Sequence, residues 1–131
     1  MSEPTGPAQV RRQGVLYLDD EEPLVFLVTR LLRRLGFEPL GFTAASEALQ
    51  AFRSDPAKFV LVLTDLSMPG ASGLDFAQEV LASSPDARVA ILTGHADETD
   101  VTRAAALGVR AVVRKPTTVD ELGPVVRELL R

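Results

Sequence analysis

The chain has 131 residues, of which 46% are hydrophobic and 24% are charged, and this composition is typical of one globular domain with an apolar core. The chain contains no cysteine, which excludes a disulfide scaffold, a thiolate zinc site and a cysteine nucleophile. Its formal net charge is −4, whereas an independent nucleic-acid-binding domain typically carries an excess of basic residues. We therefore expect no direct contact with nucleic acid.

Residues 1–13 are mostly polar and include two prolines, so we expect a disordered lead or a linker there, followed by one folded domain over residues 14–131. Such a lead is also typical of a junction between domains, which leads to the hypothesis that the chain was cut from a longer protein. No apolar run approaches the roughly 20 residues that cross a bilayer, and the first residues lack the apolar segment of a secretory signal. We therefore expect no membrane insertion and a cytoplasmic location.

Short apolar runs alternate with helical patterns along the rest of the chain. The apolar runs predict five strands, at residues 15–18, 37–42, 59–64, 89–93 and 109–113. Apolar residues at helical spacing predict five helices, at about residues 23–35, 44–53, 72–81, 97–107 and 119–129. Strands that are apolar throughout are buried on both faces, so the pattern predicts an α/β fold, a doubly wound five-stranded parallel sheet with five helices.

Local signals mark the ends of several helices. Thr43 is expected to cap the second helix, and Ser72 to begin the third after a turn at Pro69-Gly70. Residues 118–121 have the pattern of a capping box at the start of the last helix. Pro124 lies inside that helix and predicts a kink or a later start, because proline removes a backbone hydrogen bond.

Polar residues stand where the predicted strands end. Asp19 and Asp20 follow the first strand, Asp65 follows the third, Thr93 ends the fourth and Lys115 follows the fifth. Because the carboxyl ends of parallel strands meet at one edge of the sheet, we expect these side chains to lie close together. The predicted fold therefore gathers three carboxylates, one hydroxyl and one ammonium group.

This set of groups favours phosphoryl chemistry. Two carboxylates about 4 Å apart repel by roughly 4 kcal/mol at an effective dielectric constant of about 20, so three of them at one edge favour a bound cation. Hard oxygen ligands with few protein groups favour Mg²⁺. The Lys115 ammonium and the Thr93 hydroxyl suit phosphoryl oxygens, and a carboxylate can become an aspartyl phosphate.

The sequence segments around these residues are YLDDEEP, LVLTDLSMPGASGLD, ILTGH and VRKP, in this order. With them, residues 14–130 resemble the receiver domain of a two-component response regulator. The resemblance implies a flavodoxin-like (βα)5 fold with strand order 2-1-3-4-5. It also implies a signalling switch that turns over no external substrate, although it can slowly hydrolyse its own aspartyl phosphate.

The resemblance assigns roles to the acidic residues. Asp65 matches the phosphoacceptor and is also a metal ligand. Asp20 matches the direct Mg²⁺ ligand, and Asp19 matches the residue that acts on the metal more through water. Ser67 would supply its backbone carbonyl to the metal.

The remaining site positions are also assigned by resemblance. Thr93 matches the switch hydroxyl and Lys115 the lysine that pairs with the acceptor and then with phosphate, and these two residues with Asp65 form the expected catalytic set. The family has a cis bond between Lys115 and Pro116. The chain departs from the family at Val112, where an aromatic side chain is common. His95, the only histidine, is expected to be a solvent-facing loop residue.

The resemblance implies a histidine kinase or a histidine phosphotransfer protein as the partner, with a covalently linked kinase or output domain upstream and a weak homodimer as further expectations. The LTGH segment, the proline-bearing lead and the lack of an output domain favour the receiver of a hybrid sensor kinase. Two alternatives remain open. One is a receiver-like interaction module that is not phosphorylated, and the less favoured one is an enzyme or cofactor carrier on the same fold.

Overall fold

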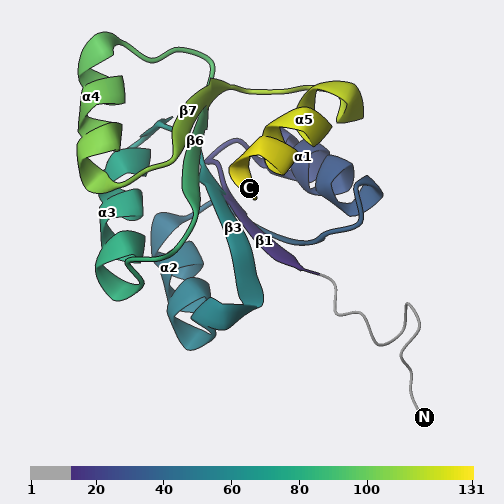
Figure 1. Cartoon of the computed structure of the whole chain (residues 1–131), viewed down its shortest axis with the longest axis horizontal. Helices are drawn as coiled ribbons and strands as arrows, with labels where there is room; N and C mark the ends of the chain where they lie inside the picture. Colours follow the sequence, from purple (N-terminus) through teal and green to yellow (C-terminus); the bar gives the residue numbers. More distant parts are fainter. Residues whose placement is uncertain (1–12) are drawn as a thin grey trace.

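A five-stranded parallel sheet forms the centre of the fold in the computed structural model, which describes residues 13–131 (Figure 1). Its strands are β1 (Gly14–Leu18), β2 (Glu38–Phe42), β3 (Phe59–Thr64), β6 (Val89–Thr93) and β7 (Ala111–Arg114), in the order β2-β1-β3-β6-β7. Because β4 and β5 lie outside this sheet, the order is the predicted 2-1-3-4-5, and the predicted fold is confirmed. The expected lead lies almost wholly outside the described residues.

Five helices cover the two faces of the sheet. They are α1 (Glu22–Arg34), α2 (Ala45–Ser54), α3 (Gly73–Ser83), α4 (Glu98–Leu107) and α5 (Val119–Leu129), with one 3₁₀ turn, η1 (Pro56–Lys58), before β3. Helices α1 and α5 lie together on one face, and α2, α3 and α4 cover the other (Figure 1). This is the doubly wound arrangement that the alternating sequence pattern predicted.

The core consists of two apolar clusters, one on each side of the sheet. Alternate residues of β1 enter different clusters: Leu16 and Leu18 pack on the side of α2 and α3, whereas Val15 and Tyr17 pack on the side of α1 and α5. All of β1 and β6 is buried. Burial on both faces explains why the strands appear in the sequence as continuous apolar runs.

A two-stranded hairpin follows β3 and was not predicted. Strands β4 (Ser67–Met68) and β5 (Ala71–Ser72) pair antiparallel around the predicted turn at Pro69-Gly70. Gly70 has a φ of 71°, a conformation that glycine adopts without strain. Ser72, predicted to begin α3, is its N-cap, and its side chain accepts a hydrogen bond of 3.1 Å from the Leu74 N–H.

Two of the predicted helix starts need correction. The N-cap of α2 is Ala44, with no side-chain hydrogen bond, so the predicted cap by Thr43 is wrong. At α5, Thr118 accepts a hydrogen bond from Glu121 N as predicted, but the Glu121 carboxylate accepts from Thr117 N at 2.7 Å. The Glu121 side chain therefore bonds to the residue before the N-cap rather than to the N–H of Thr118 itself.

The last helix does not start late. It begins at Val119 and contains Pro124 in its interior, so the predicted later start is wrong. The Thr118 cap stabilises the first turn, and the burial of Leu122, Val126 and Leu129 stabilises the helix despite the proline. Tertiary packing thus outweighs the backbone hydrogen bond that proline removes.

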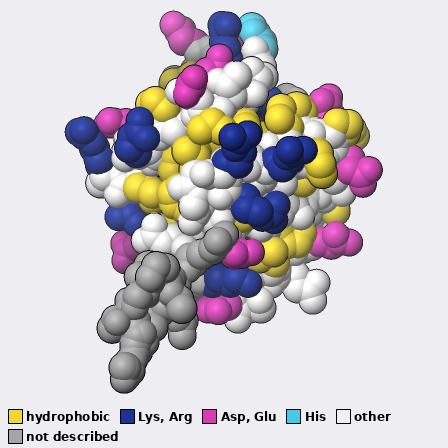
Figure 2. Space-filling view, turned by 90° about the vertical axis from the view of Figure 1, so that its right-hand side faces the viewer, with side chains coloured by type: hydrophobic (Ala, Val, Ile, Leu, Met, Phe, Trp, Pro, Cys, Tyr) yellow, Lys and Arg dark blue, Asp and Glu magenta, His cyan; other side chains and the backbone are white. Residues whose placement is uncertain are grey.

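The outer face formed by α1 and α5 carries arginines next to apolar side chains. Figure 2 shows this side of the molecule, where Lys and Arg side chains lie among hydrophobic ones. Arg30, Arg33 and Arg34 are exposed on α1, and the Arg30 guanidinium lies 5.8 Å from the ring centroid of Phe26. No helix in the described part of the chain has the length and apolar character needed to cross a membrane.

Candidate functional site

The pairing of β1 with β3 places two acidic residues side by side. The two strands run parallel with Leu18 opposite Thr64, so the next residues, Asp19 and Asp65, leave the sheet at the same edge. The Asp65 N–H donates a hydrogen bond of 2.8 Å to the Leu18 carbonyl, which extends the ladder by one step. The sheet register therefore fixes the distance between these residues.

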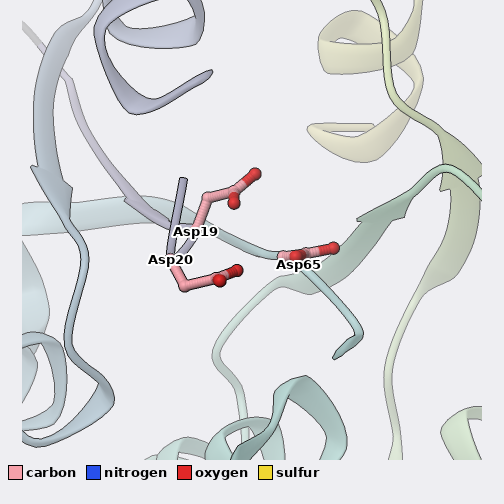
Figure 3. Close-up of side chains that lie close together, drawn as sticks. All are labelled: Asp19, Asp20 and Asp65. Atoms are coloured by element: carbon pink, nitrogen blue, oxygen red, sulfur yellow. The ribbon is translucent and has the colours of Figure 1, made fainter. Parts of the chain in front are cut away.

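Asp20 completes a cluster of three carboxylates. One oxygen each of Asp19, Asp20 and Asp65 can be chosen so that all lie within 4.8 Å of one another. Figure 3 shows Asp19 and Asp20 arriving from the same segment and the Asp20 carboxylate pointing toward Asp65. Asp19 is fully buried, Asp65 is 7% exposed and Asp20 is half-buried. The structure thus brings together the acidic residues that the sequence placed at strand ends.

Lys115 reaches the cluster from the loop after β7. Its Nζ lies 2.8 Å from Asp19 Oδ2 and 3.3 Å from Asp65 Oδ1. The backbone N–H of Lys115 donates to the Thr93 carbonyl at 3.0 Å, and this hydrogen bond holds the loop against the end of β6. All peptide bonds over residues 13–131 are trans, so the expected cis bond before Pro116 is wrong. The trans form is the isomer that X–Pro bonds favour by about 0.5–1 kcal/mol.

The buried Asp19 carboxylate has three donors. Asp19 Oδ2 accepts from the Tyr17 hydroxyl at 2.7 Å as well as from Lys115, and Asp19 Oδ1 accepts from the Glu21 N–H at 3.0 Å. Buried charges in proteins need such partners, because desolvation without them is costly. Asp65 has the Leu66 N–H, which donates to its Oδ1 at 2.8 Å, in addition to Lys115.

Burial and neighbouring charges oppose each other at this site. Burial raises the pKa of Asp65 above its ordinary value, and the charge of Asp19 adds to the rise, while Lys115 pulls the pKa down. Burial alone lowers the pKa of Lys115, but the hydrogen bonds and charges of Asp19 and Asp65 outweigh it and hold that pKa above its ordinary value. The surroundings therefore favour the charged form of Lys115 and disfavour the charged form of Asp65.

Thr93 and Ser67 are the two remaining site residues that the resemblance assigns. Thr93 is 7% exposed, and its hydroxyl donates to the His95 carbonyl at 2.9 Å and accepts from the His95 N–H at 3.2 Å. The hydroxyl is therefore engaged with the loop between β6 and α4. Ser67 begins β4, two residues after Asp65, and is exposed. His95 is exposed, as expected for a loop residue.

Val112 occupies the position where the family commonly has an aromatic residue. It lies opposite Ile91 in the pairing of β6 with β7, is half-buried, and packs against the apolar cluster on the side of α2 and α3. At this position the chain therefore has a small aliphatic side chain in the sheet.

Two residues of the site were missed in the sequence. The sequence pattern predicts Tyr17 only as part of an apolar strand, although it is the one residue of β1 with a polar tip and stands two positions before Asp19, on the same face of the strand. That spacing was the signal that could have identified it. Gly73 could not be identified from the sequence. A Cβ atom there would lie 1.8 Å from the Asp65 carbonyl oxygen, and this proximity arises only in the folded chain.

The donor set of the cluster fits a hard divalent cation. Among the residues that the structure describes, three carboxylates and no histidine or cysteine gather at this edge, and oxygen ligands of this kind suit Mg²⁺. Lys115 offsets only one of the three negative charges, so a cation would relieve the remaining repulsion.

The sequence pattern of the response regulator receiver domain matches residues 15–127. The chain belongs to this family. The receiver shares 35% of its residues over 120 positions with the DNA-binding response regulator MtrA of Mycolicibacterium smegmatis, covering 92% of this chain and 51% of MtrA. It is 37% identical over 118 residues to the sensory transduction protein RegX3 of Mycobacterium tuberculosis, covering 90% of this chain and 51% of RegX3. The chain thus spans about half the length of these relatives.

Solved structures agree with this assignment. A response regulator receiver domain protein from Clostridium thermocellum superposes with a TM-score of 0.82 at 30% identity, covering 90% of this chain and 94% of that one. The response regulator TrrA from Thermotoga maritima, solved in complex with Mg²⁺ and BeF, has a TM-score of 0.79 at 31% identity, with 90% and 99% coverage. A response regulator from Burkholderia pseudomallei, solved with a phosphorylated aspartic acid and a calcium ion, has a TM-score of 0.76 at 27% identity, with 88% and 72% coverage.

Proposed function

We propose that this receiver is a phosphoryl-accepting switch in a two-component phosphorelay and that Asp65 is the acceptor. The observation that carries the proposal is the position of Lys115 Nζ, 2.8 Å from Asp19 and 3.3 Å from Asp65 within a cluster of three carboxylates. This geometry supplies an acceptor oxygen, a cation for the incoming phosphoryl group and a set of metal ligands in one place.

In the proposed reaction, an oxygen of the Asp65 carboxylate attacks the phosphorus of a phosphohistidine on the partner. The new P–O bond forms as the P–N bond breaks, and the imidazole leaves with its electron pair and takes up a proton. The Lys115 ammonium binds one phosphoryl oxygen and offsets the negative charge of the transferring phosphoryl group. No external substrate is turned over, although the aspartyl phosphate can slowly hydrolyse.

The metal in this proposal is Mg²⁺, held by Asp20 and Asp65, by Asp19 more through water, and by the backbone carbonyl of Ser67. When bound, it neutralises charge on the phosphoryl oxygens. Support comes from the donor set described above and from the Mg²⁺ and BeF complex of TrrA.

The switch step of the proposal involves Thr93. Its hydroxyl bonds only to the His95 backbone among the described residues, and rotation of the side chain would release it to a phosphoryl oxygen on Asp65. That exchange would move the loop between β6 and α4, and with it the start of α4. The phosphoryl group thereby acts as the ligand that shifts a two-state segment.

The partner in this proposal is a histidine kinase or a histidine phosphotransfer protein, encountered in the cytoplasm. The receiver is proposed to occupy residues 14–131, and the greater length of the relatives supports a linked kinase or output domain. Direct nucleic-acid binding and membrane insertion by this segment are not part of the proposal. A weak homodimer remains compatible with it.

The acceptor assignment is tested by labelling with a small acyl-phosphate donor in the presence of Mg²⁺. We expect intact-mass analysis to detect one added phosphoryl group on the wild-type receiver and none on Asp65→Asn, because the amide lacks the nucleophilic oxygen anion. Asp75→Asn, which changes an exposed acid on α3, is the matched control and should be labelled like the wild type. Undiminished labelling of Asp65→Asn would refute the assignment.

The labelling experiment also tests a second candidate function, that of a receiver-like interaction module that is not phosphorylated. Val112 is the observation that favours it, because an aliphatic residue replaces the aromatic side chain common at this position. Such a module would neither bind Mg²⁺ in a titration nor accept a phosphoryl group.

A further inference from the structure

Tyr17 is a buried residue whose hydroxyl group is not explained by packing alone. It is 0% exposed and lies in the apolar cluster between the sheet and helices α1 and α5. A phenylalanine would fill the same space. The hydroxyl, however, reaches the end of the strand and donates a hydrogen bond of 2.7 Å to Asp19 Oδ2.

The hydroxyl completes a fixed set of donors around Asp19. Lys115 Nζ lies 2.8 Å from the same Oδ2 atom, and the Glu21 N–H donates to Oδ1 at 3.0 Å. With donors on both oxygens, the carboxylate cannot rotate without losing a hydrogen bond. Its orientation toward Asp20 and Asp65, the other two acids of the cluster, is fixed as a consequence.

The environment of Tyr17 keeps the hydroxyl a donor. Burial raises the pKa of Tyr17, and the hydrogen bond and charge of Asp19, followed by the charges of Asp65 and Glu21, raise it further. In the structure the Tyr17 O–H donates and the Asp19 carboxylate accepts.

We propose that the Tyr17 hydroxyl is a positioning group of the cation site, which holds the Asp19 carboxylate against Lys115 and thereby sets the geometry of the three carboxylates. This inference rests on the proposed Mg²⁺ site. Hydrogen-bond partners of metal-binding carboxylates typically contribute a factor of 10 to 100 in metal affinity. The competing explanation is that the hydroxyl satisfies a buried charge and contributes to stability alone.

Tyr17→Phe separates the two explanations, because it removes one oxygen atom and keeps the ring. We expect calorimetric titration with Mg²⁺ to give a dissociation constant about tenfold higher than that of the wild type. We also expect labelling by a small acyl phosphate to need correspondingly more Mg²⁺ for half-maximal rate, with the rate at saturating Mg²⁺ unchanged. An unchanged dissociation constant in a folded Tyr17→Phe variant would overturn the proposal.

Val15→Ala is the matched control. Val15 lies two residues earlier on the same face of β1, is also fully buried, and has no polar group. We expect this substitution to lower the free energy of unfolding by about 2 kcal/mol and to leave Mg²⁺ affinity unchanged. If Val15→Ala weakened Mg²⁺ binding as much as Tyr17→Phe, the effect would belong to stability and the proposal would fail.

A second measurement needs neither metal nor phosphoryl donor. The chain has one tyrosine and no tryptophan, so its tyrosine absorption band reports on Tyr17 alone. A hydrogen bond to a carboxylate moves that band to longer wavelength. We expect Asp19→Asn, which offers a weaker neutral acceptor, to move it back to shorter wavelength, and an unmoved band would contradict the proposed contact.

The two measurements distinguish failure of this inference from failure of the proposed function. Absence of Mg²⁺ binding in the wild type would refute the cation site and with it the positioning role. The tyrosine band of the metal-free protein would still decide whether Tyr17 holds Asp19. Normal Mg²⁺ binding in both the wild type and Tyr17→Phe would refute the positioning role and leave the proposed function intact.

Discussion

Gly73 illustrates how closely single residues are fitted around Asp65. It is the first residue of α3, and its N–H donates a hydrogen bond of 2.7 Å to the Leu66 carbonyl. A Cβ atom at this position would lie 1.8 Å from the Asp65 carbonyl oxygen and 2.8 Å from the carbonyl carbon. Because the obstructing atoms belong to the backbone, they cannot move aside as a flexible side chain would.

We therefore expect Gly73→Ala to lower the free energy of unfolding by about 3 kcal/mol, at the upper end of overpacking effects, and to reduce phosphoryl labelling of the folded fraction by displacing Asp65. Urea denaturation measures the first effect. Gly94→Ala is the control for stability, because a Cβ there meets nothing within 4 Å, and it should have little effect on the midpoint. Equal stability of the two variants would contradict the steric argument.

Among the helices, α4 is held least by its packing. Ala104 is its only buried residue, whereas α3 buries six residues. Its start depends on a reciprocal capping box: Asp97 Oδ1 accepts from the Asp100 N–H at 2.8 Å, and Asp100 Oδ2 accepts from the Asp97 N–H at 3.1 Å. A helix with little buried surface depends more on its cap and opens more readily.

We expect Asp97→Ala to lower the free energy of unfolding by about 1 kcal/mol, since it removes the N-cap acceptor of α4. Amide hydrogen exchange should be accelerated in α4 more than in α3, which keeps its packing. Thr43→Ala serves as the comparison, because Thr43 lies outside the N-cap of α2 and should change stability by less than about 0.5 kcal/mol. A comparable loss in Thr43→Ala would contradict the assignment of Ala44 as the N-cap of α2.

The sequence predicts the strands and helices well where buried residues form continuous runs. It does not predict structural details that depend on a single hydrogen bond. The apolar runs of β1, β3 and β6 and their topology were enough to bring Asp19 and Asp65 to one edge. The two-residue strands β4 and β5 carry no periodicity that a pattern could detect. The contact of Tyr17 with Asp19 depends on the direction of one hydroxyl, which composition does not encode.

The molecule gathers an excess of negative charge at one edge of its sheet. Helices α1 and α5 carry four arginines and four acidic residues, whereas the carboxyl edge of the sheet holds three acids against one lysine. The fold thus keeps unfavourable charge at the edge where the cation is proposed to bind, and the stability of the whole domain becomes linked to that cation. A ligand that binds only the folded state stabilises it by an amount set by its concentration relative to its dissociation constant.

This linkage gives opposite expectations with and without Mg²⁺. At a Mg²⁺ concentration 100 times the dissociation constant, the wild type should gain about 2.7 kcal/mol in its free energy of unfolding. Asp20→Asn removes one of the three repelling charges, so without Mg²⁺ we expect it to be about 1 kcal/mol more stable than the wild type. With Mg²⁺ it should gain little, because a direct ligand is lost, and the order of stability of the two proteins should reverse.

Urea denaturation in the presence and absence of Mg²⁺ measures both effects. Asp86→Asn, which removes an exposed acid between α3 and β6, changes the net charge by the same amount and should keep the full gain from Mg²⁺. If Asp20→Asn gained as much from Mg²⁺ as the wild type, the cation would bind elsewhere. A wild type that gained nothing would instead mean that the three carboxylates stay together without an ion, leaving Lys115 and the donors to Asp19 as the groups that hold them.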